Sequence, residues 1–116
     1  MSFMDFTRTI QRNEEELWVE QLFDGTTEML YPLPIVPRKA QPGDWLYTIY
    51  SGRVVGRNKI REIEIIDKVV GVGTKRFGIE ARSIIHIECP GERAPYYIPR
   101  KGHQGIRYDS VPEWAA

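Results

Sequence analysis

Residues 100–108 bring together side chains that could recognise a nucleic acid. Three of them are basic, and a histidine, a glutamine and an aromatic ring accompany them. Basic groups can neutralise phosphates, a glutamine can hydrogen-bond a base edge, and a tyrosine can stack on a base. The candidate ligand-binding residues of this segment are Lys101, Gln104, Arg107 and Tyr108. The alternative is a solvated surface loop with Tyr108 folded onto the core, because charged, glycine-rich loops are common.

The single cysteine and the histidine near it favour structural roles. Cys89 ends the apolar run of residues 84–89, which indicates a buried, inert thiol that forms no internal disulfide. His86 alternates with isoleucines and has outward parity, so we expect a partly exposed structural histidine. One cysteine and two distant histidines give no metal-ligand spacing, and we expect neither a metal nor a cofactor.

Two further patterns have simple structural interpretations. Glu62 and Glu64 would share one face of a strand, where solvation explains them better than a paired-carboxylate mechanism does. Residues 71–75 contain two glycines and a lysine, but the full phosphate-loop spacing and a following helix are missing. We therefore expect a turn there.

The composition indicates one globular domain. A chain of 116 residues can bury a core without a disulfide or a metal, so we expect one domain over residues 1–116. Residues 1–12 are expected to be a flexible or loosely docked lead-in. The 16 basic and 16 acidic residues cancel, which lowers the expectation of tight, non-specific binding to duplex DNA. No stretch approaches the about 20 apolar residues of a membrane span, and no secretory signal is visible, so a cytoplasmic location follows by elimination.

The best helix signal lies just after the lead-in. Asn13 and Glu16 resemble a capping box, and Gly25 is a natural end of the helix. Two apolar pairs at helical spacing share one face: Trp18 with Leu22, and Val19 with Phe23. A strand over residues 17–23 is the alternative, because the segment is short and its period is ambiguous.

From residue 31 onward the chain reads as an extended segment followed by strands. Four prolines predict an irregular strap over residues 31–43. Aromatic and β-branched residues predict a strand over 45–50, and Ser51-Gly52 predicts a two-residue turn into the next strand. Gly56 marks a bulge, after which we expect the strand to continue through residues 60–66.

The later part of the chain also alternates. Residues 76–82 place Phe77, Ile79 and Ala81 inward, and residues 85–89 repeat the pattern. Residues 96–98 and 106–108 could each close a sheet edge. Consecutive short strands with few helices between them predict a mainly β fold, an antiparallel barrel or sandwich with one or two short helices.

Residues 41–56 carry a resemblance to a known family. Their Pro-Gly-Asp turn, buried strand, hairpin and Val-Gly-containing second strand resemble the PUA-like superfamily, particularly its ASCH and EVE branches. The resemblance covers about residues 25–90. It implies a PUA-like β-barrel and, as a function, the binding of RNA or a modified nucleotide.

The ASCH branch also implies an enzymatic alternative. ASCH domains often carry a Gly-x-Lys-x-x-Glu-x-Arg-like motif before the Gly-Asp turn. Here Gly25 and Glu28 align with it, whereas its lysine and arginine are missing. A hydrolase or ribonuclease acting on a nucleoside or RNA would use Glu28 as its catalytic candidate, helped by Lys39 or Lys101.

Three hypotheses result. The first is a non-catalytic PUA-like module whose pocket combines Tyr50, Ser51 and Arg53 with Lys101, Gln104, Arg107 and Tyr108. The second is the ASCH-like hydrolase. The third is an accessory module whose neutral surface and exposed aromatic side chains engage a protein partner.

Overall fold

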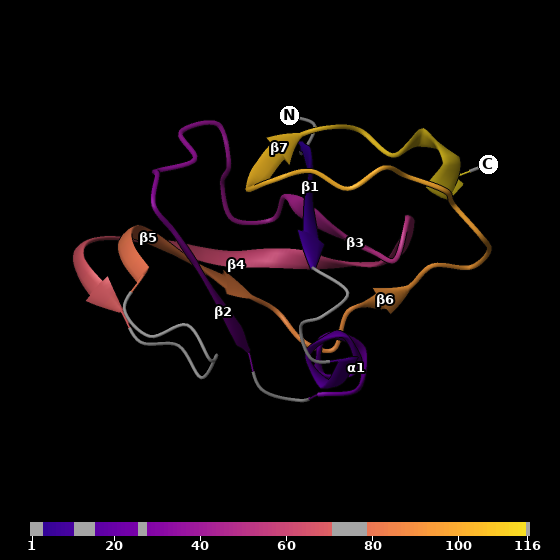
Figure 1. The fold of residues 1–116 in the computed structure, drawn as a ribbon, viewed down its shortest axis with the longest axis horizontal. Helices are drawn as coiled ribbons and strands as arrows, with labels where there is room; N and C mark the ends of the chain where they lie inside the picture. Colours follow the sequence, from indigo (N-terminus) through magenta and orange to yellow (C-terminus); the bar gives the residue numbers. More distant parts are fainter. Residues whose placement is uncertain (1–3, 11–15, 26–27, 71–78, 116) are drawn as a thin grey trace.

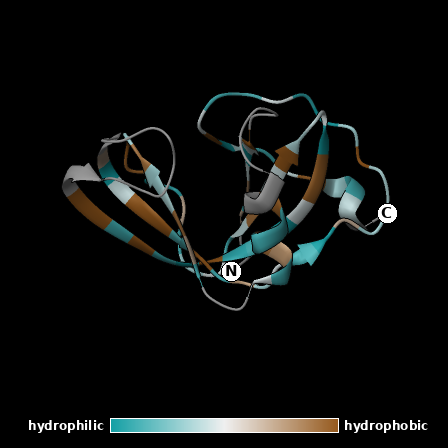
Figure 2. Ribbon diagram, turned by 60° about the horizontal axis from the view of Figure 1, so that its bottom comes forward, coloured by the Kyte–Doolittle hydropathy of each residue, from teal (hydrophilic) through white to brown (hydrophobic). Residues whose placement is uncertain are grey.

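A computed structural model describes residues 4–10, 16–25, 28–70 and 79–115 of the chain. Its elements are β1 (Asp5–Ile10), α1 (Glu16–Asp24), β2 (Met29–Leu33), β3 (Trp45–Tyr50), β4 (Arg53–Val70), β5 (Ile79–Ile87), β6 (Glu92–Arg93), β7 (Ile106–Tyr108) and the 3-10 helix η1 (Pro112–Ala115). The strands form one sheet in the order β2-β5-β4-β3-β1-β7, with β6 also paired to β4 (Figure 1). The sheet curls into a half-barrel (Figure 2). The mainly β prediction is confirmed.

The hairpin between β3 and β4 follows from its turn residues. Ser51 and Gly52 both have positive φ, 55° and 79°, as a type I′ turn requires. Thr48 lies opposite Gly56 whereas Ile49 lies opposite Val54, so Val55 is an extra residue in β4. The bulge thus lies beside Gly56, in agreement with the prediction, and it brings Val55 towards the core under α1.

Helix α1 packs on the sheet at Gly56, which confirms the helical interpretation. A Cβ at Gly56 would lie 2.2 Å from Phe23 Cε1 and 2.5 Å from the Glu92 carbonyl oxygen, so only glycine permits this approach. Val19, Leu22 and Phe23 are buried against the sheet. The helix ends with a hydrogen bond from the Gly25 amide to the Gln21 carbonyl. Asn13 and the Trp18 side chain lie outside the described residues.

Strand β1 corrects the expectation of a flexible lead-in. Residues 5–10 form an interior strand, parallel to β3 on one side and antiparallel to β7 on the other. Phe6, Thr7 and Arg8 are buried. Phe6 and Arg8 face the core under α1, whereas Thr7 faces His103 on the other side of the sheet.

Asp44 fixes the position of β1. Its Oδ1 accepts a hydrogen bond from the Met4 amide at 3.0 Å, and its Oδ2 accepts one from the Gln41 amide at 2.9 Å. Its own carbonyl accepts the Ile60 amide, and the Gly43 amide donates to the Ile60 carbonyl. The fully buried carboxyl group therefore joins the start of β1 to the strap before β3, and the backbone of Gly43 and Asp44 joins this turn to β4.

Two apolar clusters cover the two faces of this part of the sheet. The larger lies under α1 and includes Leu22, Leu46, Ile60, Ile85 and Ile87. The smaller lies under residues 94–115 and contains Tyr47, Ile49, Val54, Ile98 and Val111. Among the described residues, no helix is long and apolar enough to cross a membrane.

Other predicted segments have mixed outcomes. The strap of residues 31–43 contributes its first three residues to β2, and residues 106–108 form β7 as expected. Residues 96–98 form no strand; a single bridge between Arg53 and Pro99 joins this stretch to β4. The predicted turn and partial phosphate loop over residues 71–75, and Phe77, lie outside the described residues.

We expect Asp44→Ala to lower the free energy of unfolding by about 1–3 kcal/mol, because it leaves two backbone amides without an acceptor. Asp44→Asn keeps one side-chain oxygen as an acceptor, so its free energy of unfolding should fall by less. Urea unfolding followed by tryptophan fluorescence measures both. Glu62→Gln, at an exposed acid on β4, is the control and should resemble the parent. An Asp44→Ala protein as stable as the control would contradict the role given to this side chain.

Candidate functional site

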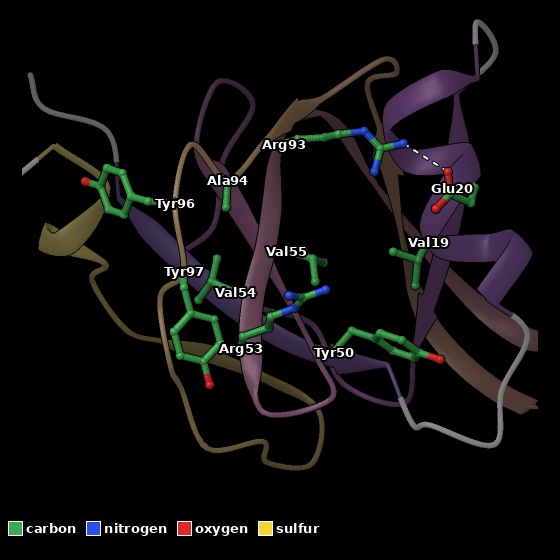
Figure 3. A pocket seen from close by; sticks show the side chains of 10 residues that line it. All are labelled: Val19, Glu20, Tyr50, Arg53, Val54, Val55, Arg93, Ala94, Tyr96 and Tyr97. Carbon is green, nitrogen blue, oxygen red and sulfur yellow. Dashed lines mark hydrogen bonds and ion pairs between the residues drawn. The ribbon is translucent and has the colours of Figure 1, made fainter.

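A pocket of about 430 Å³ lies where the β3–β4 hairpin meets α1 and β6 (Figure 3). Tyr50 and Arg53 come from the hairpin, and Val19 and Glu20 from the helix. The remaining wall is Val54, Val55, Arg93, Ala94, Tyr96 and Tyr97. The pocket is therefore built by four elements and by the segment that follows β6.

The tight turn places Tyr50 and Arg53 together. They are the last residue pair before the turn, and directly opposed residues of an antiparallel pair project from the same face. The next pair, Ile49 and Val54, is buried among the residues under 94–115. In Figure 3, the Arg53 side chain extends between Tyr97 and Tyr50.

The two pocket arginines differ in their partners. Arg93 donates to Asp24 at 2.9 Å and to Glu20 at 3.0 Å. These hydrogen bonds raise the pKa of Arg93 above the ordinary value, and the bond to Asp24 has the larger effect. Arg93 is thereby neutralised from α1. Arg53 is exposed and makes no ion pair with any residue in the described part of the chain. Its guanidinium is the cation that this pocket offers to a ligand.

Two tyrosines border the pocket from the segment after β6. The Ala94 amide donates to the Val55 carbonyl and the Val54 amide to the Ile98 carbonyl, so residues 94–98 run along β4. Tyr96 donates its hydroxyl to the Glu113 carbonyl, and Tyr97 is 68% exposed. A segment fixed at both ends thus presents an aromatic ring to solvent, which suits stacking on a ligand.

The structure separates the predicted site residues into groups. Tyr50 and Arg53 line the pocket, and Ser51 lies in the adjoining turn. Lys101 and Gln104 are exposed in the segment after Arg100, whose amide donates to the Gly52 carbonyl near the hairpin tip.

Arg107 and Tyr108 project from opposite faces of β7, because successive residues of a strand alternate. Arg107 lies opposite Thr7, and Tyr108 lies opposite Phe6, with the two rings edge-to-face at 5.7 Å. Tyr108 therefore packs partly on the core, as the alternative interpretation held, and stays 55% exposed. Neither residue lines the pocket.

The sequence interpretation missed Glu20, Arg93, Tyr96 and Tyr97 as pocket residues. The last two were assigned to a strand. Pro95 and Pro99 on either side of them were the available signal, because proline removes amide donors and disfavours a sheet interior.

Glu28 is held by His86. Glu28 Oε1 lies 2.9 Å from His86 Nδ1, and His86 Nε2 lies 2.9 Å from Glu64 Oε1. Arg61 also approaches Glu28, at 3.5 Å. Glu64 is thus an ion-pair partner and not merely a solvated acid, which corrects the sequence interpretation. Neither Lys39 nor Lys101 is among the partners of Glu28 in the described residues.

The pKa values of this group follow from its contacts. Burial opposes the charge on His86, but hydrogen bonds to Glu28 and Glu64 outweigh it and raise its pKa. The same bond to His86 lowers the pKa of Glu28. A histidine engaged at both nitrogens and a carboxylate with a lowered pKa are poorly suited to general-base chemistry.

Cys89 and the metal-binding side chains are the remaining candidates for chemistry in this part of the molecule. Burial raises the pKa of the half-buried Cys89 thiol, which disfavours the reactive thiolate. In the described ranges, no group of three or more histidine, cysteine or acidic side chains could hold a metal ion.

Comparisons with protein-family models, with curated proteins and with solved structures give no match. The resemblance of residues 41–56 to the PUA-like superfamily therefore stays a prediction, and the site is interpreted from its own geometry.

We expect the stabilisation from His86 to depend on pH. A raised histidine pKa contributes stability that is fully present below the unfolded value of about 6.5 and is lost as the pH rises through the folded value. The lowered pKa of Glu28 adds stability above its ordinary value, which is lost in acid. Urea midpoints of the parent minus those of His86→Gln should therefore fall as the pH rises above about 6.5. His103→Gln replaces the other histidine and is the control. Its urea midpoints should change with pH as those of the parent do. A difference between parent and His86→Gln that is constant with pH would contradict the assignment.

Proposed function

We propose that this protein is a small PUA-like module that binds RNA or a modified nucleotide in the pocket of Tyr50 and Arg53. The observation that carries the proposal is the position of Arg53, an exposed guanidinium without an ion-pair partner among the described residues, beside exposed aromatic rings. Nucleic-acid sites that accept single strands combine a cation for the phosphate with aromatic faces for the bases.

Each lining side chain has a role in this proposal. Arg53 meets a phosphate or a base edge, and its planar fork suits bidentate contact with either. Tyr50 and Tyr97 supply the faces on which a base stacks. Arg93 stays with Glu20 and Asp24, so it shapes the wall and leaves Arg53 as the cation for the ligand.

The size of the charge favours a nucleotide or a short single strand over a duplex. The chain has no net charge, and the pocket holds two arginines against one glutamate. Duplex binding that depends on phosphate neutralisation needs several free cations in a row. One free guanidinium among aromatic rings suits one or two nucleotides.

The hydrolase and accessory-module alternatives have less support. A hydrolase centred on Glu28 would need a free base and a cation, and the partners of Glu28 are His86 and Arg61. An accessory module would use the exposed rings of Tyr97 and Tyr108 against a protein, a role that does not involve Arg53, which has no ion-pair partner in the described part of the chain.

We expect Arg53→Gln and Tyr97→Ala each to weaken binding of a fluorescent eight-nucleotide single-stranded RNA while leaving the thermal midpoint unchanged. Loss of the stacking ring should cost about 1–3 kcal/mol of binding free energy. Loss of Arg53 should reduce the slope of the logarithm of the binding constant against the logarithm of the salt concentration by about one unit. Titrations at two salt concentrations measure both effects.

Arg107→Gln is the matched control, because Arg107 is also an exposed arginine but lies outside the pocket. It should bind like the parent. Weaker binding by Arg107→Gln together with unchanged binding by Arg53→Gln would move the site to the C-terminal segment. Absence of any RNA or nucleotide binding would favour the accessory module.

A further inference from the structure

A second cleft lies between the strap that follows β2 and the beginning of β5. It has a volume of about 430 Å³ and is lined by Pro34, Ile35, Val36, Arg38 and Arg82. None of these residues lines the Tyr50–Arg53 pocket. The cleft thus joins two arginines from different elements to an apolar wall.

Arg38 and Arg82 differ from most other arginines of the described chain. Arg57, Arg61, Arg93 and Arg100 each pair with at least one carboxylate. Within the described ranges, no carboxylate pairs with Arg38 or with Arg82, although acidic and basic residues are equal in number. Two like charges lining one cleft without a counter-ion favour an anionic ligand.

The strap that carries Arg38 is held in place without a ligand. Ser83 donates its hydroxyl to the Ile35 carbonyl, and the Ala40 amide donates to the Pro37 carbonyl. The Gln41 amide is bound by the buried Asp44. A segment ordered in advance loses little conformational entropy when it binds a ligand.

An apolar groove continues from the cleft. A neighbouring cavity of about 650 Å³ shares Val36 and Arg38 with it and is otherwise lined by Pro37, Ala40, Gln41, Pro42, Glu62, Ile63 and Ile65. Ile65 is 72% exposed and Ile35 is 52% exposed, the largest exposed fractions among the described isoleucines and leucines. Neighbouring exposed apolar side chains of this kind mark a binding surface.

We propose that this surface binds a phosphate monoester that carries an apolar group. Two guanidinium groups offer two positive charges and several N–H donors, which suit the three terminal oxygens of a dianionic phosphate better than a single carboxylate. The apolar part of the ester lies along Pro37, Ile63 and Ile65. Glu62, on the groove, repels a second anionic group, so the ligand carries its charge at the arginine end.

Phenyl phosphate and inorganic phosphate test the proposal by isothermal titration calorimetry. We expect phenyl phosphate to bind more tightly than inorganic phosphate, and Arg38→Gln or Arg82→Gln to weaken phenyl phosphate at least fivefold. Ile65→Ser should weaken the binding of phenyl phosphate and leave the binding of inorganic phosphate unchanged. Arg61→Gln, at an exposed arginine on β4 outside the cleft, is the matched control.

Two further arms identify the source of the phosphate and separate this site from the pocket. Vesicles of phosphatidylcholine with and without phosphatidic acid test a lipid headgroup as the source. Binding that depends on Arg82 and occurs only with the vesicles that contain phosphatidic acid identifies a lipid ester. The phenyl phosphate titrations are made in the Arg53→Gln background, which removes the free cation of the Tyr50–Arg53 pocket, so binding at that pocket does not contribute to the result. The proposal is overturned if Arg38→Gln and Arg82→Gln bind like Arg61→Gln, or if inorganic phosphate binds as tightly as phenyl phosphate.

Discussion

The carboxyl group of Asp44 is the constraint on which the arrangement of the sheet depends. A parallel strand pair has no tight turn to set its register, so β1 and β3 must be aligned by another contact. Asp44 supplies it by accepting the Met4 amide one residue before β1, which places Asp5 opposite Trp45. A slip of one residue would exchange the faces of the whole strand and turn Phe6 away from the core. The same carboxyl group orders the strap, and through it the position of Arg38.

Two consecutive residues of β4 then attach the covers of the two faces. The side-chain Nδ2 of Asn58 donates to the Leu22 carbonyl of α1 and to the Glu88 carbonyl, which holds the helix and the chain before β6 on one face. Arg57 lies on the other face, stacked 3.9 Å from the Trp45 ring centre and 4.6 Å from that of Trp114, with Glu92 as its ion-pair partner. Because successive strand residues alternate, one dipeptide holds the helix on one side and η1 on the other. The Tyr50–Arg53 pocket lies at the hairpin end, between these covers.

Local signals predicted the hairpin, the helix and β7, whereas contacts between distant residues defined the rest. Ser51 and Gly52 determine their turn by backbone preference alone, and Val19 and Phe23 reveal a helix by spacing. Strand β1 was missed because Arg8 interrupts its apolar face. The structure accommodates this charge by stacking it on the Tyr31 ring at 4.7 Å, although burial lowers the pKa of Arg8. Glu64 and Tyr97 were misjudged for a related reason, because residues distant in the sequence define their surroundings. His86 is 22 residues from Glu64, and the pocket beside Tyr97 includes Tyr50 and Arg53 of the β3–β4 hairpin.

The charges of the chain balance in number, but the basic side chains differ in whether they pair with an acid. The ion pairs of Arg93 with Glu20 and Asp24 are exposed and contribute little to stability, so their main effect is to neutralise Arg93 beside the pocket. Among the described arginines that pair with no carboxylate, three line a pocket: Arg53 follows a tight turn, Arg38 lies in a proline-rich strap, and Arg82 lies on the adjoining strand. In each place the backbone is fixed by local geometry or by hydrogen bonds, so the cation is presented at small entropic cost. Net charge and average composition therefore describe the surface poorly. In both proposals the anion meets a guanidinium group that pairs with no carboxylate among the described residues, and the aromatic or aliphatic wall beside that group determines the rest of the ligand.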